Sequence, residues 1–398
     1  MKISKRIQNI NPSATLELTT KVTEMRAQGI DVIAFNVGEP DFGTPENVCE
    51  AGINAIREQK TKYTVVSGIA PLKAAICKKL RGDNGLDYTP AQISIGVGAK
   101  QPLFNAICTL CDEGDEVILP TPCWVSYIEM IKLAGGVPVL VPMSEENGFG
   151  LDVAAVEAAI TPRTTAILIN TPNNPTGAVY TEESLRALAK VALAHDIMVI
   201  SDEIYEKLIY SGEPFFSIGS ISPEMLAHTV TINGFSKAYA MTGWRVGYAA
   251  GPLEVIKGMN AFMGHATSNT ASISQYAALA ALEGPQDSVE TMRQEFDRRR
   301  VYLTARLRAM PGVTCADANG AFYLLPNVSS FFGKTAPDGT KIENSKDVAM
   351  YLLNAAHIAV VQGDAFAAPD NLRISYSNSM EALKEGADRM EKALAALK

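Results

Sequence analysis

The sequence predicts an α/β protein in which a parallel sheet, covered by helices on both faces, is followed by a smaller α/β domain. Between about residues 90 and 250, short β-rich runs alternate with helical stretches, which is the order typical of such sheets. After about residue 285 the pattern changes to one long charged helix and several short strands. A length of 398 residues also favours more than one domain.

In the central region the sequence predicts strands separated by amphipathic helices. The expected strands cover residues 92–97, 116–119, 138–141, 166–170, 197–201 and 229–233, and helices are expected over 101–111, 126–134 and 181–195. Ligands of such sheets bind beyond the carboxyl ends of the strands. Several unusual residues of this chain fall at those ends.

The C-terminal part is expected to begin with a helix over residues 287–310, whose run Arg298-Arg299-Arg300 is interpreted as a solvent-exposed face. Short strands are expected around 313–316, 321–325, 358–361 and 372–375, before a closing helix over 380–397. We therefore expect an N-terminal arm with part of the small domain in residues 1–45, a large domain in 46–285 and a small domain in 286–398.

Composition and charge exclude several classes of protein. The chain is 47% hydrophobic and 20% charged, as in ordinary globular proteins, and its net charge of −8 argues against a nucleic-acid partner. No stretch approaches the length of a membrane span, and no apolar segment follows the basic residues 1–12 as in a signal peptide. Cys108 and Cys111 have metal-ligand spacing but no second pair, so we expect one face of a helix and no metal. The cytoplasm is the expected compartment.

The most informative segment runs from Asn233 to Gly247 and reads Asn-Gly-Phe-Ser-Lys-Ala-Tyr-Ala-Met-Thr-Gly-Trp-Arg-Val-Gly. Lys237 follows an apolar strand and has small neighbours, a setting that lowers the pKa of an amine and favours Schiff-base chemistry. Arg245 supplies a permanent, forked charge that suits a phosphate. A single lysine is ordinarily a surface residue, but the long pattern favours a functional one.

Two further strand ends carry polar residues. Asp202 ends one strand and Tyr205 follows three residues later, while Asn174 lies in the turn between Asn170 and Gly177. A solvated acid and an ordinary turn are the alternative interpretations of each motif alone. Together with Lys237, however, they form the set that pyridoxal phosphate requires: an acid for the pyridine nitrogen, hydrogen bonds for the phenolic oxygen and a lysine for the aldehyde.

With these motifs, the chain resembles the class I/II aminotransferases of pyridoxal-phosphate fold type I, and among them the bacterial aspartate aminotransferases. The resemblance runs from Val37-Gly-Glu-Pro-Asp-Phe42 to Leu372-Arg-Ile-Ser-Tyr376. It implies a large domain with a mostly parallel seven-stranded sheet, a smaller C-terminal α/β domain and pyridoxal 5'-phosphate as cofactor. It also implies a homodimer whose active sites are shared across the interface.

The resemblance implies a role for each motif residue toward the cofactor. Lys237 would hold it as an aldimine and carry the proton between Cα and C4′, and Asp202 would pair with the pyridinium nitrogen. Tyr205 and Asn174 would bond the phenolic oxygen, and Trp124 would stack on the ring. The phosphate would be bound by Arg245, by backbone amides of Gly98, Ala99 and Lys100, and by a Tyr63 from the neighbouring subunit.

One position departs from the family pattern. Many relatives have a phosphate-binding serine three residues before the lysine, where this chain has Gly234, and Ser236 is the nearby candidate to replace it.

For the substrate, the resemblance implies that Arg373 clamps the α-carboxylate, helped by Gly38, Asn174 and Trp124. Lys100 matches the lysine thought to meet the distal carboxylate of aspartate or glutamate, and a cation at a helix start is otherwise unfavourable. The expected reaction moves the amino group of an L-amino acid, aspartate first, to 2-oxoglutarate by a ping-pong mechanism. Aromatic amino acids, prephenate and alanine stay open, and so does a carbon–sulfur β-lyase, which uses the same lysine, aspartate and tyrosine.

Overall fold

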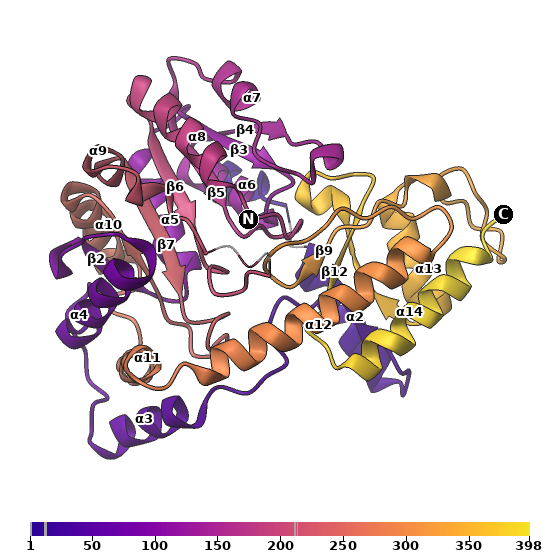
Figure 1. Ribbon diagram of the computed structural model, residues 1–398, viewed down its shortest axis with the longest axis horizontal. Helices are drawn as coiled ribbons and strands as arrows, with labels where there is room; N and C mark the ends of the chain where they lie inside the picture. The colour runs from indigo at the N-terminus through magenta and orange to yellow at the C-terminus, as the bar shows by residue number, and fades with distance from the viewer. Residues whose placement is uncertain (1, 12–13, 211, 213) are drawn as a thin grey trace.

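A seven-stranded sheet organises the computed structural model, which describes residues 2–11, 14–210, 212 and 214–398 (Figure 1). All its strands run parallel except β8, which pairs antiparallel with both of its neighbours. The order across the sheet is β2 (Ile93–Gly96), β8 (Gly247–Ala250), β7 (Thr229–Gly234), β6 (Met198–Asp202), β5 (Thr164–Asn170), β3 (Glu116–Thr121) and β4 (Val137–Pro142). The predicted fold class, a mostly parallel sheet in an α/β protein, is confirmed.

Helices cover both faces of this sheet because successive strand side chains point to opposite sides. Val117 and Leu119 pack with α5 (Lys100–Leu110), α6 (Val125–Ala134) and α10 (Leu253–Ala266). Ile118, between them, packs in a cluster with α7 (Val153–Ala158), α8 (Glu182–Ala194) and α9 (Pro223–Ala227). At the β2 side, the apolar side chains pack with α3 (Glu46–Arg57), α4 (Ala70–Lys79) and α11 (Ser272–Glu283).

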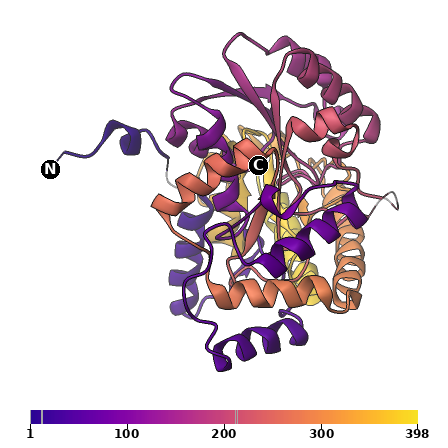
Figure 2. The same ribbon diagram turned by 90° about the vertical axis from the view of Figure 1, so that its left-hand side faces the viewer.

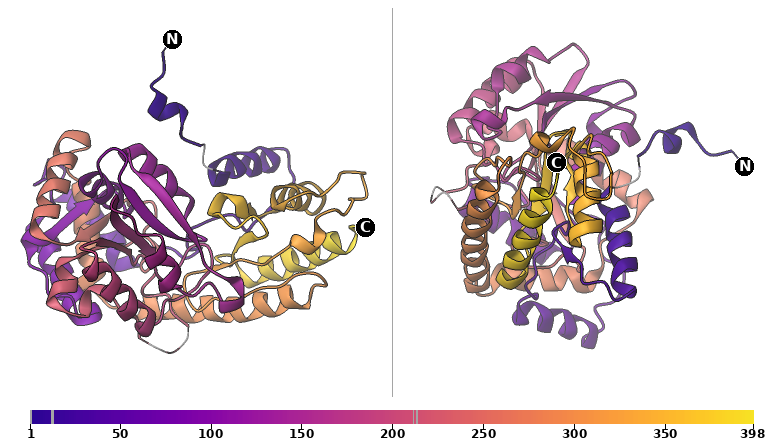
Figure 3. Two further views of the ribbon diagram at one scale, coloured as in Figure 1. Left: turned by 90° about the horizontal axis from the view of Figure 1, so that it is seen from above. Right: turned by 90° about the vertical axis from the view of Figure 1, so that its right-hand side faces the viewer.

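A second body of structure follows the sheet and is built on the long helix α12 (Asp287–Ala309), seen at the right of Figure 1 and at the right of the left-hand view in Figure 3. It contains β9 (Tyr323–Leu324), β11 (Val361–Gln362) and β12 (Leu372–Ser375) in one small sheet, with α13 (Ser345–Ala356) and α14 (Met380–Ala395). The N-terminal β1 (Ile33–Ala34) pairs in parallel with β10 (Ile358–Ala359), so a segment before residue 45 joins this C-terminal body. The exact domain boundaries stay a prediction.

The remaining elements are short or N-terminal. Residues 2–11, with α1 (Lys5–Gln8), extend away from the body in Figures 2 and 3, and α2 (Ala14–Ala27) precedes β1. The short helices are η1 (Leu80–Asn84), η2 (Pro90–Gln92), η3 (Glu145–Asn147), η4 (Ile218–Ser220), η5 (Ser329–Phe331) and η6 (Gly363–Phe366). Of the N-terminal arm expected in residues 1–45, positions 1, 12 and 13 lie outside the described residues.

Three sequence predictions are wrong. The run from Arg298 to Arg300 is a solvated face only at Arg298, which is 59% exposed, because the Arg299 side chain is 7% exposed and binds Asp41 and Glu295. Residues 313–316 form no strand, since a single bridge at Thr314 replaces the ladder. The expected strand over 358–361 is two strands, β10 and β11, because the chain passes from one small sheet to another there.

The described residues form neither a helix that could span a membrane nor a cluster of metal-ligating side chains. No helix there is long and apolar enough to cross a membrane. No group of three or more histidine, cysteine, aspartate or glutamate side chains there could hold a metal ion, and Cys108 and Cys111 are free thiols near one end of α5.

The packing of α14 gives a test of the C-terminal core. Alanine is normally better than glycine in a helix by about 1 kcal/mol. A Cβ at Gly386, however, would lie 2.3 Å from the Phe35 ring, which is fully buried. Overpacking of this kind costs about 1–3 kcal/mol. We expect Gly386→Ala to lower the free energy of unfolding, measured by urea denaturation.

The matched control is Gly264→Ala in α10, where a Cβ would meet nothing within 4 Å. This variant should be as stable as the parent chain or slightly more stable. Equal stabilisation by both substitutions would contradict tight packing between α14 and Phe35.

Candidate active site

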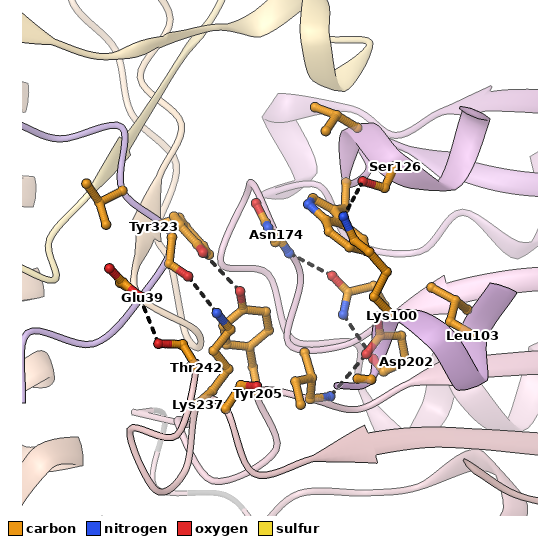
Figure 4. A pocket seen from close by; sticks show the side chains of 18 of the residues that line it. Glu39, Lys100, Leu103, Ser126, Asn174, Asp202, Tyr205, Lys237, Thr242 and Tyr323 are labelled. Carbon is orange, nitrogen blue, oxygen red and sulfur yellow. Dashed lines mark hydrogen bonds between the residues drawn. The ribbon is translucent and has the colours of Figure 1, made fainter. Parts of the chain in front are cut away.

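A cavity of about 670 Å³ lies at the carboxyl ends of the strands, where the C-terminal body meets the large sheet (Figure 4). Its volume is in the range of small-molecule sites. Most of the residues predicted to act on cofactor or substrate line it, namely Gly38, Ala99, Lys100, Trp124, Asn174, Asp202, Tyr205, Ser236, Lys237, Arg245 and Arg373. The fold thus brings together side chains that are up to 335 positions apart in the chain, from Gly38 to Arg373.

Lys237 follows β7 and enters the cavity from the turn after that strand. Its Nζ donates a hydrogen bond to the Gly38 carbonyl oxygen at 2.5 Å and lies 5.8 Å from the centre of the Tyr205 ring. Burial lowers the pKa of Lys237 to about 8, although the negative charge of Glu39 opposes this. A larger fraction of this amine is therefore neutral, and nucleophilic, than for an ordinary lysine.

Asp202 ends β6 and presents a buried carboxylate to the cavity. The carboxylate accepts hydrogen bonds from the Tyr127 hydroxyl at 2.7 Å and from the backbone N–H of Ile204 at 3.2 Å. Burial raises the pKa of Asp202 to about 6, while these two hydrogen bonds lower it. A buried carboxylate is costly without a charged partner, so this one suits a protonated ring nitrogen.

Asn174 and Arg373 also line the cavity, where their side chains bond each other. The Asn174 side-chain oxygen accepts a hydrogen bond from Arg373 Nη1 at 3.2 Å, and Nη2 donates to the Asn36 carbonyl oxygen at 2.8 Å. Arg373 is 2% exposed, and its Nε has no hydrogen-bond partner among the described residues. A buried guanidinium with a donor to spare suits a carboxylate, which accepts bidentate hydrogen bonds.

A cradle for an anion lies at the start of α5. Arg245 Nη1 donates to the Thr242 carbonyl oxygen, and a Cβ at Gly98 would lie 2.7 Å from Arg245 Nη2, so only glycine leaves room for the guanidinium there. Gly98 also has a φ of +66°, which favours glycine. Ala99 cannot cap α5 with its methyl group, which leaves the first N–H groups of the helix for an anion.

Gly234, where the chain departs from the family pattern, lies at a tightly packed point of the sheet. Gly234 lies opposite Gly247 in the pairing of β7 with β8, and a Cβ at Gly234 would lie 3.0 Å from Gly247 Cα. A serine there would require the neighbouring strand to shift by a few tenths of an ångström. Ser236 lines the cavity instead, two residues further along.

Lys100 begins α5 and crosses the face of Trp124. Its Nζ lies 4.6 Å from the centre of the Trp124 ring and donates a hydrogen bond to the Ser126 hydroxyl at 3.3 Å (Figure 4). Burial lowers the pKa of Lys100, and the positive charge of Arg245 lowers it further. A cation in this position can receive a second negative group of a ligand.

Sequence reasoning missed several residues of the site. Tyr127 holds Asp202, Tyr323 bonds Tyr205 at 2.9 Å, and the Thr242 hydroxyl donates to the Glu39 carboxylate at 2.8 Å. Tyr127 could have been noticed three residues after Trp124, but nothing in the sequence relates Tyr323 to Tyr205. Tyr63 lies apart from the residues that line the cavity in the described chain and is 91% exposed.

Comparison with known proteins identifies the family. The family model for "Aminotransferase class I and II" matches residues 30–390. An aspartate aminotransferase of Geobacillus stearothermophilus is 49% identical over all of both chains, and an aspartate/prephenate aminotransferase of Cereibacter sphaeroides is 46% identical over 99% of both. The crystal structure of the aspartate aminotransferase from Rhizobium meliloti is 42% identical and superposes over both full chains with a TM-score of 0.96. The chain therefore belongs to the class I and II aminotransferases.

Proposed function

We propose that the chain transfers the amino group of L-aspartate to 2-oxoglutarate in two half-reactions at the cavity that holds Lys237. The observation that carries the choice of substrate is the placement of Lys100 over Trp124, in the same cavity as Arg373. A dicarboxylic amino acid needs two cationic partners, because each buried carboxylate is costly unless it is paired. Arg373 can serve the α-carboxylate and Lys100 the distal one.

The residues of the cavity fit pyridoxal 5'-phosphate, the cofactor of this family. Arg245, Gly98 and the start of α5 form a site that suits the phosphate. The buried carboxylate of Asp202 suits the protonated ring nitrogen. When bound, this cofactor supplies an aldehyde that takes up the amino group and a ring that accepts electrons. In our proposal Ser236 and the amides of Gly98, Ala99 and Lys100 join Arg245 at the phosphate.

The chain's own residues then have distinct tasks. Lys237 Nζ would be the base that takes up the proton of the substrate Cα and later gives it back, which requires the neutral amine that its lowered pKa favours. Tyr205 and Asn174 would donate hydrogen bonds to the phenolic oxygen of the cofactor, and Trp124 would cover its ring. Arg373 fixes the α-carboxylate, with Gly38 beside it, so that the Cα–H bond is presented to Lys237.

Prephenate is the second candidate amino-group acceptor, since a relative 46% identical is named an aspartate/prephenate aminotransferase. Prephenate also carries two carboxylates, so Lys100 would serve it in the same way. Aromatic amino acids and alanine have no second carboxylate for Lys100 to bind, and β-elimination gives Lys100 no such role. These alternatives therefore rank below aspartate and prephenate.

We further propose a homodimer in which Tyr63 reaches the phosphate in the neighbouring subunit. Tyr63 is 91% exposed and Val65 69% exposed, an exposure of large apolar side chains that suits a covered interface. We expect the dimer in the cytoplasm, because all six cysteines are free thiols and free thiols persist in reducing compartments.

The first prediction concerns the attachment of the cofactor. Reduction of the holoenzyme with borohydride, followed by peptide mapping, should find the pyridoxyl group on Lys237. Lys100 lines the same cavity and serves as an internal control, since its Nζ is engaged by Ser126 and Trp124. A pyridoxyl group on Lys100 or on any other lysine would contradict the assignment.

The second prediction concerns the substrate. Lys100→Met keeps the aliphatic stem over Trp124 and removes the charge, so kcat/KM for aspartate should fall. The fall should correspond to a loss of about 1.5–3 kcal/mol of transition-state stabilisation, the scale of a charge-assisted hydrogen bond. Activity with alanine should change much less. Lys190→Ala, an exposed lysine of α8, is the control and should leave both substrates unaffected.

Half-reactions followed by cofactor absorbance separate this outcome from its rivals. An equal loss for aspartate and alanine would tie Lys100 to the phosphate rather than to the substrate. Release of pyruvate and ammonia from a β-substituted amino acid, without amino transfer, would identify a β-lyase.

The third prediction tests the shared site by mixing two inactive variants, Lys237→Ala and Tyr63→Ala. If Tyr63 crosses the interface, a hybrid dimer has one site with an intact Lys237 and a Tyr63 contributed by the partner. Each hybrid dimer should then have half the activity of the parent dimer, so a fully exchanged equimolar mixture, half of whose dimers are hybrids, should reach about a quarter of the parent activity. No rise, despite exchange verified by mass spectrometry, would show that Tyr63 acts within its own subunit.

A further inference from the structure

Tyr323 contacts two residues of the site that come from different regions of the chain, Tyr205 and Arg373. It belongs to β9 and pairs with Ser375 of β12, so its side chain shares a face of the small sheet with Arg373, two residues along. Tyr323 is 1% exposed and yet lines the cavity, with its hydroxyl directed toward that of Tyr205 in Figure 4. Sequence reasoning gave it no role.

Within the described part of the chain, the hydroxyl of Tyr323 has one hydrogen-bond partner, the hydroxyl of Tyr205 at 2.9 Å. Each hydroxyl carries a single proton. In the proposed function the Tyr205 hydroxyl would donate its hydrogen bond to the phenolic oxygen of the cofactor, so the Tyr323 hydroxyl would donate to Tyr205 Oη. Donation to an oxygen polarises that group's own O–H bond and makes it a stronger donor.

The space around this hydroxyl is set by Gly38. A Cβ at Gly38 would lie 3.0 Å from Tyr323 Oη, closer than ordinary packing allows. The same residue accepts the hydrogen bond from Lys237 Nζ through its carbonyl oxygen. The hydroxyl pair is therefore held against the backbone that positions the amine.

The ring of Tyr323 holds a second residue. The guanidinium carbon of Arg373 lies 4.6 Å from the centre of the Tyr323 ring and 4.9 Å from that of Phe366. A desolvated cation is attracted to aromatic faces, and two faces define the plane of a guanidinium. With Nη1 and Nη2 bound to Asn174 and Asn36, this orientation decides where the substrate carboxylate can bind.

We propose that Tyr323 is a positioning residue of the transamination site, with two separable contributions: its hydroxyl strengthens Tyr205 as a donor, and its ring orients Arg373. This inference rests on the proposed function. It predicts that deletion of the hydroxyl changes the absorbance pKa of the bound cofactor but not the binding of the substrate carboxylate. Deletion of the ring should change both quantities.

The hydroxyl is tested with Tyr323→Phe holoenzyme by titrating the absorbance of the bound cofactor against pH. A weaker donor at Tyr205 stabilises the phenolate less, so the absorbance pKa should rise by about 0.3–1 pH unit, the equivalent of part or all of a net hydrogen bond. KM for aspartate should stay within about twofold, since the ring of Tyr323 stays over Arg373. Tyr376→Phe is the matched control.

Tyr376 is a buried tyrosine of the same cluster, and its hydroxyl donates to the Ala321 carbonyl oxygen at 3.2 Å, away from Tyr205 and Arg373. Its removal should leave the absorbance pKa unchanged. In a Tyr205→Phe background, adding Tyr323→Phe should shift the absorbance pKa no further, because the hydroxyl acts through Tyr205. A shift that persists there, or no shift in the single variant, would overturn this contribution.

The ring is tested with Tyr323→Leu, for which KM for aspartate should rise about 3–30-fold, the range of a desolvated cation–π contact. An unchanged KM would overturn the second contribution. Should Tyr323→Phe fold poorly, 3-fluorotyrosine at position 323 replaces it: the more acidic hydroxyl is a stronger donor, so the absorbance pKa should fall. If the wild-type chain shows no cofactor chromophore at all, the proposed function fails, and this inference with it.

Discussion

The side chain of Asn170 sets the geometry on which the rest of the site depends. Asn170 ends β5 directly opposite Asp202, the last residue of β6. Its amide nitrogen donates to the Asp202 carbonyl oxygen at 2.9 Å, and its amide oxygen accepts from the Asn174 backbone N–H at 2.8 Å. One buried amide thus fixes the position of the Asp202 residue at the end of β6 relative to that of Asn174 in the loop after β5. Because a slip of one residue would turn each side chain to the other face of the sheet, the strand register makes this arrangement reproducible.

The second determinant of the site is that its charged side chains come from both bodies of structure. Asp202 ends a strand of the large sheet and Lys237 follows another, whereas Arg373 belongs to the small sheet, and each body has its own buried apolar cluster. Positive side chains outnumber negative ones along the cavity, which is lined by Lys100, Lys237, Arg245 and Arg373 against Asp202 and Glu39. An excess of positive charge in a partly desolvated cavity favours anions. A phosphate at Arg245 and carboxylates at Arg373 and Lys100 are the anions for which these elements have the matching geometry.

Much of this could be predicted from the sequence, and the failures have physical causes. Parallel strands that are buried on both faces appear as apolar runs, so most of their positions were evident, but β8 was missed because its Gly-Tyr-Ala-Ala is too short to show a period. Arg299 seemed exposed because its partner Asp41 is 258 positions away. The roles of the residues around Lys237 could be predicted because these residues belong to one continuous motif. Tyr323 was not, since its meaning depends on contacts with Tyr205 and Arg373 that only the tertiary fold creates.

The polar residues of the cavity are held by the protein itself rather than by what binds there. Tyr127 bonds Asp202, Asn174 bonds Arg373, and Tyr323 bonds Tyr205, all with side chains that are buried. Side chains that are already fixed lose little conformational entropy when a ligand arrives, and dipoles that are already oriented need no reorganisation during proton transfer. Burial moves the pKa of Lys237 down and that of Asp202 up, each toward its neutral form. A ligand that brings a cationic nitrogen to Asp202 and anions to the arginines would reverse this cost, so the fold holds these groups in place for a partner of complementary charge.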